Sequence, residues 1–254
     1  MAKNFETGIQ QRAYAELPEM AIVKNFLSET DLMIHVPAYP ALSDFFNTKA
    51  LKTVYLTPPL DEFFNRTIKR TTDLIIAVLV IIFLLSWITP LMAILIKLTS
   101  RGPVFFLQKR NKRKGDLFTC IKFRSMFVNS DADILPAGKH DKRITRLGKF
   151  LRNHYLDELP QFFNVLIGDM SVVGPRPHMV SDNLKYEEQV NYYGYRHSVK
   201  PGITGLAQVM GYVGAADNID KMRERVNMDI FYLRHWSFKL DITILLRTFG
   251  RSFR

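Results

Sequence analysis

A single long apolar segment dominates the pattern of hydrophobic and polar positions along the chain. No charged residue occurs in residues 74–96, and leucine, isoleucine and valine fill most of these positions. A continuous helix of this length rises by about 1.5 Å per residue and reaches roughly 34 Å, enough to cross the hydrocarbon core of a bilayer. Buried helices of soluble proteins seldom run so far without a charge, so this segment is predicted to enter a membrane.

Both flanks of the apolar segment are basic. The residues concerned are Arg66, Lys69 and Arg70 before it and Lys97 and Arg101 after it. Lysine and arginine gather on the cytoplasmic side, so a simple span would leave one basic flank on the wrong side. Pro90 removes a backbone donor and bends a helix. We therefore expect a re-entrant helix hairpin broken near Pro90, with a kinked span as the alternative.

Shorter elements follow. Residues 104–108 and 117–123 are predicted strands around a basic turn at Gly115. Helical patterns come at residues 147–151, 217–233 and 241–254, and glycine-rich and proline-rich loops separate them. The last helix is basic and amphipathic, which suits either a membrane surface or packing on the core. These elements predict a helix-rich α+β fold.

The balance of charge points to an anionic partner. The net charge is +11 and the sequence pI is near 9.7. Such an excess is typical of contact with nucleic acid, an anionic membrane or a phosphorylated substrate. Nucleic acid is not expected, because no recognised binding motif occurs and such binding would not explain the apolar run. The single cysteine, Cys120, excludes a disulfide within the chain and is predicted to be a packed thiol.

Two adjacent carboxylates are the first candidates for chemistry. Asp157 and Glu158 stand between apolar residues, and neighbours on a helix point about 100° apart. The pair would therefore divide its roles, one carboxylate contacting the reacting atom and the other a metal ion. By itself, such a pair is more typical of a solvated surface.

Basic residues around this pair strengthen the functional interpretation. Lys122 and Arg124 flank the end of a predicted strand, Arg152 precedes the pair, and Arg176 stands between two prolines. An arginine with so restricted a backbone offers a fork of donors suited to phosphate oxygens. Phosphoryl chemistry uses cations around a polyphosphate, usually a divalent metal, and carboxylates to hold that metal.

Residues 64–249 resemble the bacterial sugar transferase family, also called monotopic phosphoglycosyl transferases. The matching motifs, in family order, are KFRSM at 122–126, LDELPQ at 156–161, NVLIGDMS at 164–171, GPRP at 174–177 and VKPGITGLAQV at 199–209. So many long motifs in one order are not a chance match. The family also has a re-entrant helix, which agrees with the topology inferred from the basic flanks.

The resemblance implies a two-step reaction. Asp157 would attack the β-phosphorus of a UDP-sugar and release UMP, and polyprenyl phosphate, expected to be undecaprenyl phosphate, would then take the phosphosugar. Glu158 would hold Mg²⁺. The residues expected to contact phosphate or substrate are Lys122, Arg124, Arg152, Arg176, His197 and Lys200. His197 is equally compatible with a packed or surface histidine, and Asp241, which also fits a family pattern, is most simply a helix cap.

The sugar is less certain than the reaction type. Residues 225–237 are similar to the relatives that initiate exopolysaccharide and capsule synthesis, which favours glucose or galactose. Met210 stands where the family often has asparagine, which is a departure at the expected sugar pocket. The alternatives are an N-acetylhexosamine-1-phosphate transferase of the same family, or a non-catalytic membrane scaffold of polysaccharide assembly.

The expected organisation has three parts. Residues 1–60 would form an accessory extension, residues 61–100 the re-entrant membrane helix and its flank, and residues 101–254 a cytoplasmic catalytic domain ending in an interfacial helix. The larger relatives carry several membrane spans before this region, whereas the first sixty residues here hold no apolar span. The implied location is the inner leaflet of the bacterial cytoplasmic membrane, where the enzyme would begin exopolysaccharide, capsule or O-antigen synthesis. A homodimer is among the expected assemblies.

Overall fold

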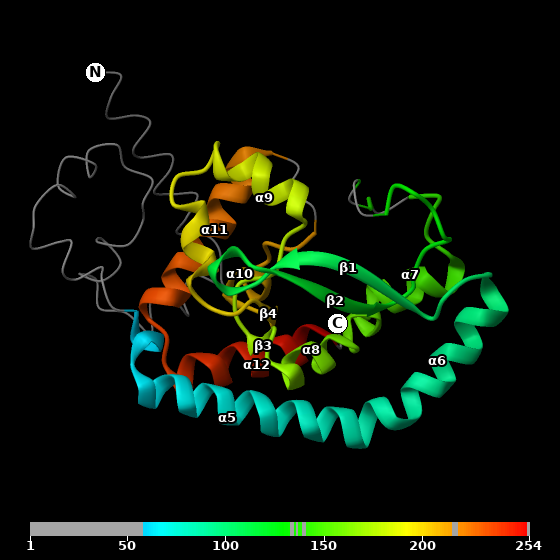
Figure 1. The fold of residues 1–254 in the computed structure, drawn as a ribbon, viewed down its shortest axis with the longest axis horizontal. Coiled ribbons are helices and arrows are strands. Elements are labelled where there is room, and N and C mark those ends of the chain that lie inside the picture. The colour runs from blue at the N-terminus through cyan, green and yellow to red at the C-terminus, as the bar shows by residue number, and fades with distance from the viewer. Residues whose placement is uncertain (1–57, 133–134, 136, 139–140, 215–217, 253–254) are drawn as a thin grey trace, which may run out of the picture. The chain divides into compact units, whose positions relative to one another are not determined.

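The computed structural model describes residues 58–132, 135, 137–138, 141–214 and 218–252 (Figure 1). The predicted accessory extension therefore falls almost wholly outside the described residues. The described part is a helix-rich α+β structure, as the sequence predicts, and it contains two small sheets.

One long helix carries the apolar segment. α5 (Phe63–Val80), a π-helical turn (Ile81–Leu85) and α6 (Ser86–Thr99) follow one another without interruption, and Figure 1 shows them as a single bent helix. By length and composition this helix could cross a membrane, and only 17% of its most apolar window is buried. An apolar helix so poorly covered by protein exposes most of its hydrophobic surface.

The helix is not broken at Pro90, contrary to the prediction. Pro90 lies inside α6, and the irregular turn comes earlier, where the amide of Ser86 donates to the carbonyl of Ile81. Proline clashes with the carbonyl four residues before it, so a wider turn just upstream relieves the crowding. Within the described residues the segment is thus a bent helix and does not form two antiparallel arms.

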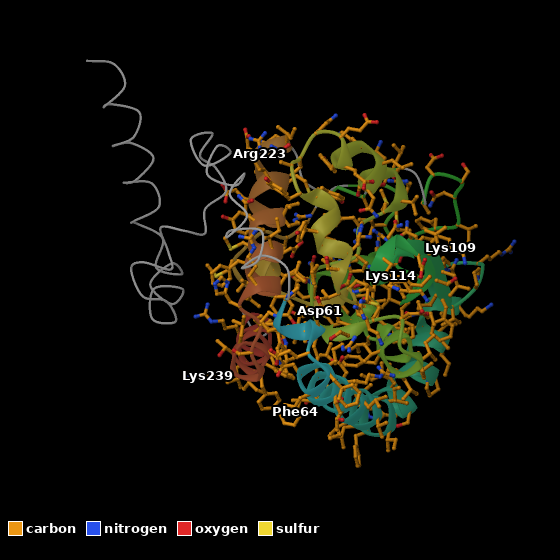
Figure 2. All side chains as sticks on the ribbon, turned by 60° about the vertical axis from the view of Figure 1, so that its left-hand side comes forward. Asp61, Phe64, Lys109, Lys114, Arg223 and Lys239 are labelled. Atoms are coloured by element: carbon orange, nitrogen blue, oxygen red, sulfur yellow. The ribbon has the colours of Figure 1, made fainter. Side chains whose placement is uncertain are left out.

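The two faces of this helix differ. Ala77, Leu85 and Ile96 are fully buried against the rest of the fold, whereas Phe83 and Leu98 are exposed. Figure 2 shows mainly carbon atoms projecting from the lower side of the helix, near the labelled Phe64. Nitrogen and oxygen atoms are more frequent over the remainder of the fold, so the long helix carries a nearly uninterrupted apolar surface on this side.

The two sheets have two strands each. β1 (Phe105–Asn111) and β2 (Leu117–Phe123) form the predicted antiparallel hairpin, with Phe105 opposite Phe123. β3 (Ser171–Val173) and β4 (Gly202–Thr204) pair in parallel, with Ser171 opposite Gly202. The second sheet was not predicted, because its short strands lie in segments whose glycine and proline content indicates loops.

The remaining helices are α7 (Arg146–Asn153), α8 (Gln161–Ile167), α9 (Val180–Glu187), α10 (Leu206–Val209), α11 (Ile219–Arg234) and α12 (Phe238–Ser252). α7 begins where the Thr145 hydroxyl accepts a hydrogen bond from the amide of Gly148 at 2.9 Å, which satisfies one amide of its first turn. α8 ends at Gly168, whose φ of 96° suits glycine. The helical patterns predicted for α7, α11 and α12 are confirmed.

α12 packs one face on the core, as one interpretation of the C-terminal helix predicts, and its contact with a membrane surface stays a prediction. Its residue Ile244 is buried in the core, whereas Leu246 and Phe249 are exposed. Asp241 is not the cap of this helix but lies within it. Its carboxylate accepts hydrogen bonds from Lys69 of α5 at 2.7 Å and from Tyr232 at 2.8 Å. The predicted cap is therefore a buried polar link between two helices that are far apart in sequence.

Two glycines allow the close approaches that shape the region around the carboxylates. A Cβ atom on Gly148 of α7 would lie 1.8 Å from the carbonyl oxygen of Ser125, and one on Gly202 of β4 would lie 2.1 Å from the amide nitrogen of Gly174. No side chain fits in either place. The first contact holds the 122–126 segment against α7, and the second holds the start of the Gly-Pro-Arg-Pro segment against β4.

Candidate active site

A single 3-10 turn holds the two adjacent carboxylates. The turn Leu156–Glu158 joins α7 to α8, and Tyr155 just before it adopts a φ of 56°, in the left-handed region. Asp157 and Glu158 are each only 7% exposed. Charged side chains are seldom so buried unless partners compensate for the loss of water, so the surroundings of each carboxylate are informative.

Glu158 pairs with two cations. Its Oε1 accepts a hydrogen bond from Nζ of Lys122 at 2.7 Å, and its Oε2 accepts one from Nη1 of Arg176 at 2.8 Å. Arg176 also donates from Nη2 to Oε1, which completes a bidentate pair. Such a fork fixes both groups in orientation as well as in distance.

Asp157 has different surroundings. Among the described residues its carboxylate has no hydrogen bond or ion pair, and its side chain lines a large cavity. Burial, and next the charge of Glu158, raise the pKa of Asp157, whereas Lys122, Arg152 and Arg176 act in the opposite direction. An ionised Asp157 therefore presents unshared oxygen lone pairs to whatever occupies the cavity.

The pKa of Glu158 moves the other way. Burial alone would raise it, but the charges of Arg176 and Lys122 and their hydrogen bonds hold the pKa of Glu158 well below its usual range. Glu158 in turn raises the pKa of Arg176. The environment thus gives the adjacent carboxylates separate characters: the two cations favour the ionised form of Glu158, and Asp157 is an available base or nucleophile.

The cavity in front of Asp157, which we call the cationic cavity, has a volume of about 960 Å³. Pockets of this size hold ligands as large as drug molecules or cofactors. Its basic lining residues are Arg110, Lys122, Arg124, Arg152, Arg176, Lys185 and Arg225. Arg152 has no hydrogen bond or ion pair among the described residues. The cavity is thus suited to a polyanionic ligand placed against a nucleophilic carboxylate.

The comparison with known families agrees with this chemistry. A model of the bacterial sugar transferase family matches residues 64–254, a range that contains the 3-10 turn and the whole basic lining of the cationic cavity. The chain belongs to the bacterial sugar transferase family. The resemblance inferred from the short motifs is confirmed.

Relatives within the bacterial sugar transferase family have defined names. The UDP-glucose:undecaprenyl-phosphate glucose-1-phosphate transferase of Klebsiella pneumoniae is 43% identical over 240 residues, which cover 91% of the chain and 51% of that protein. A Xanthomonas campestris pv. campestris protein of the same name is 49% identical over 185 residues, covering 71% of the chain and 37% of that protein. The UDP-N-acetylgalactosamine-undecaprenyl-phosphate N-acetylgalactosaminephosphotransferase of Aeromonas hydrophila is 44% identical over 188 residues, covering 71% of the chain and 42% of that protein.

The coverage of these relatives is uneven. The chain spans about half the length, or less, of these three proteins. The alignment with the Klebsiella pneumoniae protein covers 91% of the chain, which is more than residues 64–254 can supply. Part of the region before Phe64 therefore also aligns with that bacterial sugar transferase.

The structure brings most of the predicted family residues together. Lys122, Arg152 and Arg176 line the cationic cavity with both carboxylates. Arg124 lines it too, but its guanidinium donates to the backbone carbonyls of Ser100, at 2.8 Å, and Arg101. These carbonyls follow the end of α6, so in this structure Arg124 anchors the long helix to the sugar transferase domain. A contact between Arg124 and substrate remains a prediction.

His197 and Lys200 lie apart from the cationic cavity. His197 borders a small separate hollow on the other side of Arg176 and Pro177, and burial and then the charge of Arg196 lower the pKa of His197 to about 4. Lys200 lies near Gly168, and burial and then Arg70 lower the pKa of Lys200. The structure therefore does not place these two residues beside Asp157 and Glu158, which we call the dyad, and their contacts with substrate also remain predictions.

Several buried polar residues beside the cavity were not predicted. Nη2 of Arg196 donates to Asp229 and to the backbone carbonyl of Arg176, each at 2.8 Å. Burial, followed by the charges of Arg196 and Arg225, holds the pKa of His178 well below its usual value. This network supports the backbone of Arg176 from behind. No sequence pattern predicts the contact between Arg196 and Asp229, although Arg196 directly precedes His197, which was a predicted substrate contact.

The dyad fits a divalent metal that depends on its substrate for ligands. Among the described residues no three His, Cys, Asp or Glu side chains gather as a metal site. Mg²⁺ is commonly held by one or two carboxylates together with substrate phosphates. Oε2 of Glu158 accepts only the bond from Nη1 of Arg176, so it keeps a lone pair for a metal. The residues present are therefore compatible with the expected Mg²⁺ at Glu158.

Proposed function

We propose that this protein transfers glucose-1-phosphate from UDP-glucose to undecaprenyl phosphate and releases UMP. The observation that carries the proposal is the buried carboxylate of Asp157, unpaired among the described residues, which faces a cavity lined by Lys122, Arg152 and Arg176. Membership of the bacterial sugar transferase family and the names of the relatives supply the substrate classes. The reaction would initiate the synthesis of an exopolysaccharide or a related polymer.

In the first half-reaction an oxygen of Asp157 attacks the β-phosphorus of UDP-glucose. A bond forms between this oxygen and phosphorus, and the bond from phosphorus to the bridging oxygen breaks. UMP leaves with the electron pair of that bond. Because an ionised carboxylate needs no base to become a nucleophile, the step requires only alignment and charge neutralisation. The enzyme is left with an acyl phosphate, in which Asp157 carries the glucose phosphate.

The cations around the dyad have distinct roles in this step. Arg152 is free to bind phosphate oxygens, whereas Lys122 and Arg176 are held in place by Glu158 and present their remaining donors to the cavity. Bound Mg²⁺, held through Glu158, would neutralise part of the charge of the diphosphate. Glu158 therefore orients the cationic groups, and Asp157 performs the substitution.

In the second half-reaction an oxygen of undecaprenyl phosphate attacks the same phosphorus. The bond from phosphorus to Asp157 breaks and the carboxylate is regenerated. The product is a lipid diphosphate that carries the glucose. Since the phosphorus is bonded to Asp157 only between the two half-reactions, Asp157 must alternate between a free carboxylate and an acyl phosphate during each cycle.

The membrane arrangement belongs to the same proposal. We infer that the bent helix enters and leaves the cytoplasmic leaflet on one side, with the catalytic domain in the cytoplasm of a bacterium. The basic residues on both flanks support this topology, and so do the exposed apolar face of the helix and the exposed Leu246 and Phe249 of α12. The short segment Asp61–Glu62 and the hairpin turn at Gly115 would then share the cytoplasmic side.

Glucose is the favoured sugar because relatives at 43% and 49% identity carry that specificity in their names. Galactose remains the sequence-based alternative. An N-acetylhexosamine is the next, since a relative at 44% identity is named for N-acetylgalactosamine.

A UMP-release assay tests the proposal. Purified protein with Mg²⁺ and undecaprenyl phosphate is offered UDP-glucose, UDP-galactose, UDP-N-acetylglucosamine and UDP-N-acetylgalactosamine in parallel. We expect release with UDP-glucose and its loss in Asp157→Asn. UMP release only with an N-acetylated donor would show that the sugar is an N-acetylhexosamine. No UMP release with any of the four donors, from protein shown to be folded, would favour a non-catalytic scaffold.

A further inference from the structure

A second, smaller cavity borders the dyad. Its volume is about 100 Å³, and it lies among residues of α8, β4, α10 and α12. Its lining includes Leu159, Phe162, Ile203, Thr204, Val209 and Thr248. We call it the apolar cavity.

The two cavities share a wall. Tyr155, Glu158 and Val213 line both of them. Glu158 thus stands between a large space suited to anions and a small space built mainly of hydrocarbon, and Asp157 lines the large space beside it. A transferase that brings a nucleotide sugar and a lipid phosphate to one carboxylate needs two such spaces.

The surface of the apolar cavity offers little to a polar ligand. Glu158 is its only charged lining residue within the described part of the chain, and that charge is already paired with Lys122 and Arg176. The hydroxyls of Thr204 and Thr248 lie 2.7 Å apart, and Thr248 donates to the carbonyl of Ile244 at 2.8 Å. Gln208 also lines the cavity, and its Nε2 donates to the carbonyl of Ile203 at 3.1 Å. The rest of the lining is mainly hydrocarbon and these polar groups already have protein partners, so the ligand that fits is a hydrocarbon group.

We propose that the apolar cavity binds the isoprene unit next to the phosphate of a polyprenyl phosphate acceptor. This inference rests on the proposed function, because that acceptor carries a hydrocarbon unit directly joined to the attacking phosphate. An apolar cavity of about 150 Å³ can hold a benzene-sized ligand. A volume of about 100 Å³ therefore suits one branched five-carbon unit and excludes a longer stretch of chain.

The position of the cavity suits this occupant. A first isoprene unit held there would place its phosphate at the wall formed by Tyr155, Glu158 and Val213, beside Asp157 on the other side. The rest of the lipid must leave toward an apolar surface. The helices that supply Phe162 and Thr248 also expose apolar side chains, Ile167 on α8 and Leu246 on α12, so such a surface is close at hand.

Two matched substitutions on α12 test the proposal. Thr248→Phe fills the apolar cavity, whereas Thr243→Phe places the same side chain on the same helix outside that cavity. Both threonines donate to the carbonyl four residues earlier, at 2.8 Å for Thr248 and 2.9 Å for Thr243. Each variant is assayed for exchange of labelled UMP into UDP-glucose without acceptor, and for the KM of undecaprenyl phosphate in the complete reaction.

We expect Thr248→Phe to raise the KM of the acceptor by about tenfold or more, the loss expected when roughly two buried methylene groups stay outside. UMP exchange should be unchanged in both variants, and Thr243→Phe should keep the wild-type KM. An unchanged acceptor KM in Thr248→Phe with intact exchange would overturn the proposal. Absence of exchange in the wild-type protein would instead contradict the proposed function itself.

A second measurement on the unmodified protein covers the case in which Thr248→Phe fails to fold. Neryl phosphate and n-octyl phosphate have main chains of equal length, but only neryl phosphate has the branched, unsaturated first unit. We expect neryl phosphate to be used at least about tenfold better, as kcat/KM. Equal use of the two acceptors would contradict a site for the first isoprene unit.

Discussion

Arg176 binds the carboxylate of Glu158 with both terminal nitrogens of its guanidinium, and Nη1 lies 2.8 Å from Oε2. The two residues are 18 positions apart, and the backbone of Arg176 is fixed by its flanking prolines and by Arg196. Because Lys122 and Arg176 bind Glu158, Asp157 is the unpaired carboxylate of the dyad among the described residues. The proposed division of roles between the neighbouring acids depends on this pair.

Replacing Arg176 with lysine keeps the charge but removes the fork. We expect Arg176→Lys to lower kcat by about 10-fold to 100-fold, because a preorganised donor in the cationic cavity is lost. The free energy of unfolding should fall by about 2 kcal/mol, the contribution of a hydrogen bond to a buried charged group. Steady-state UMP release and thermal denaturation measure the two effects. The matched control is Arg223→Lys in the exposed pair with Asp220, which should change neither value.

The raised pKa of Asp157 predicts an acid limb in the pH profile. Because the folded protein holds the pKa of this carboxyl above its ordinary value, Asp157 gains its proton at a higher pH than an exposed aspartate does. UMP exchange should be fully present above that raised pKa and lost as the pH falls through it. Lys122 lowers the pKa of Asp157, so Lys122→Met should move the acid limb to higher pH.

The exchange rate as a function of pH in wild type, Lys122→Met and Lys149→Met measures this shift. Lys149 is an exposed residue of α7, so its replacement should leave the limb in place. An acid limb that stays put or moves to lower pH in Lys122→Met would show that Asp157 is not the group being titrated.

The ion pair between Lys69 and Asp241 should stabilise the fold. Their side chains are 10% and 8% exposed, with 2.7 Å between Nζ and Oδ2, and Tyr232 and Trp236 also donate to Asp241. Asp241→Ala leaves a buried ammonium group without its counterion, which costs about 3–5 kcal/mol. Thermal denaturation in detergent measures the loss. Asp220→Ala, in an exposed pair on α11, serves as the control, and equal melting temperatures for the two variants would contradict this role of Asp241.

The membrane arrangement can be tested by cysteine labelling. The native Cys120 is buried, so added cysteines report with little background. Asp61 precedes the long helix and Lys109 follows it, and both are labelled in Figure 2. An impermeant maleimide should modify Asp61→Cys and Lys109→Cys in inside-out vesicles, and neither in intact spheroplasts. Modification of the two from opposite sides would mean that the helix spans the bilayer.

The sequence predicted the elements whose signals are local. The uncharged run, the strands around Gly115 and the amphipathic helices all follow from the order of apolar and polar residues, and the structure confirms them. Pro90 correctly predicted an irregularity in the helix. The irregular turn lies upstream, at Ile81–Leu85, because the proline ring crowds the backbone of the preceding turn. The β3–β4 pairing depends on the contact of Gly174 with Gly202, which is not local in sequence.

Contacts between segments that are distant in sequence also limit what can be predicted of the site. The motifs predicted Lys122 and Arg176 around the dyad, the basic residues upstream of the pair added Arg152, and the structure brings all three to one cavity. The roles of Arg196 and Asp229 were missed because buried ion pairs between distant segments leave no pattern in a single sequence. Arg124 shows the converse limit: its motif position suggested phosphate binding, whereas its guanidinium binds backbone carbonyls after α6.

The central claim is that Asp157 carries the sugar phosphate between the half-reactions, and mass spectrometry tests it most directly. Intact protein is incubated with UDP-glucose and Mg²⁺ without acceptor, then quenched and digested. We expect a mass increase of one hexose phosphate on the peptide that contains Asp157, its absence in Asp157→Asn, and its disappearance when undecaprenyl phosphate is added before the quench. Steady transfer by Asp157→Asn, or an adduct on a different residue, would contradict the account.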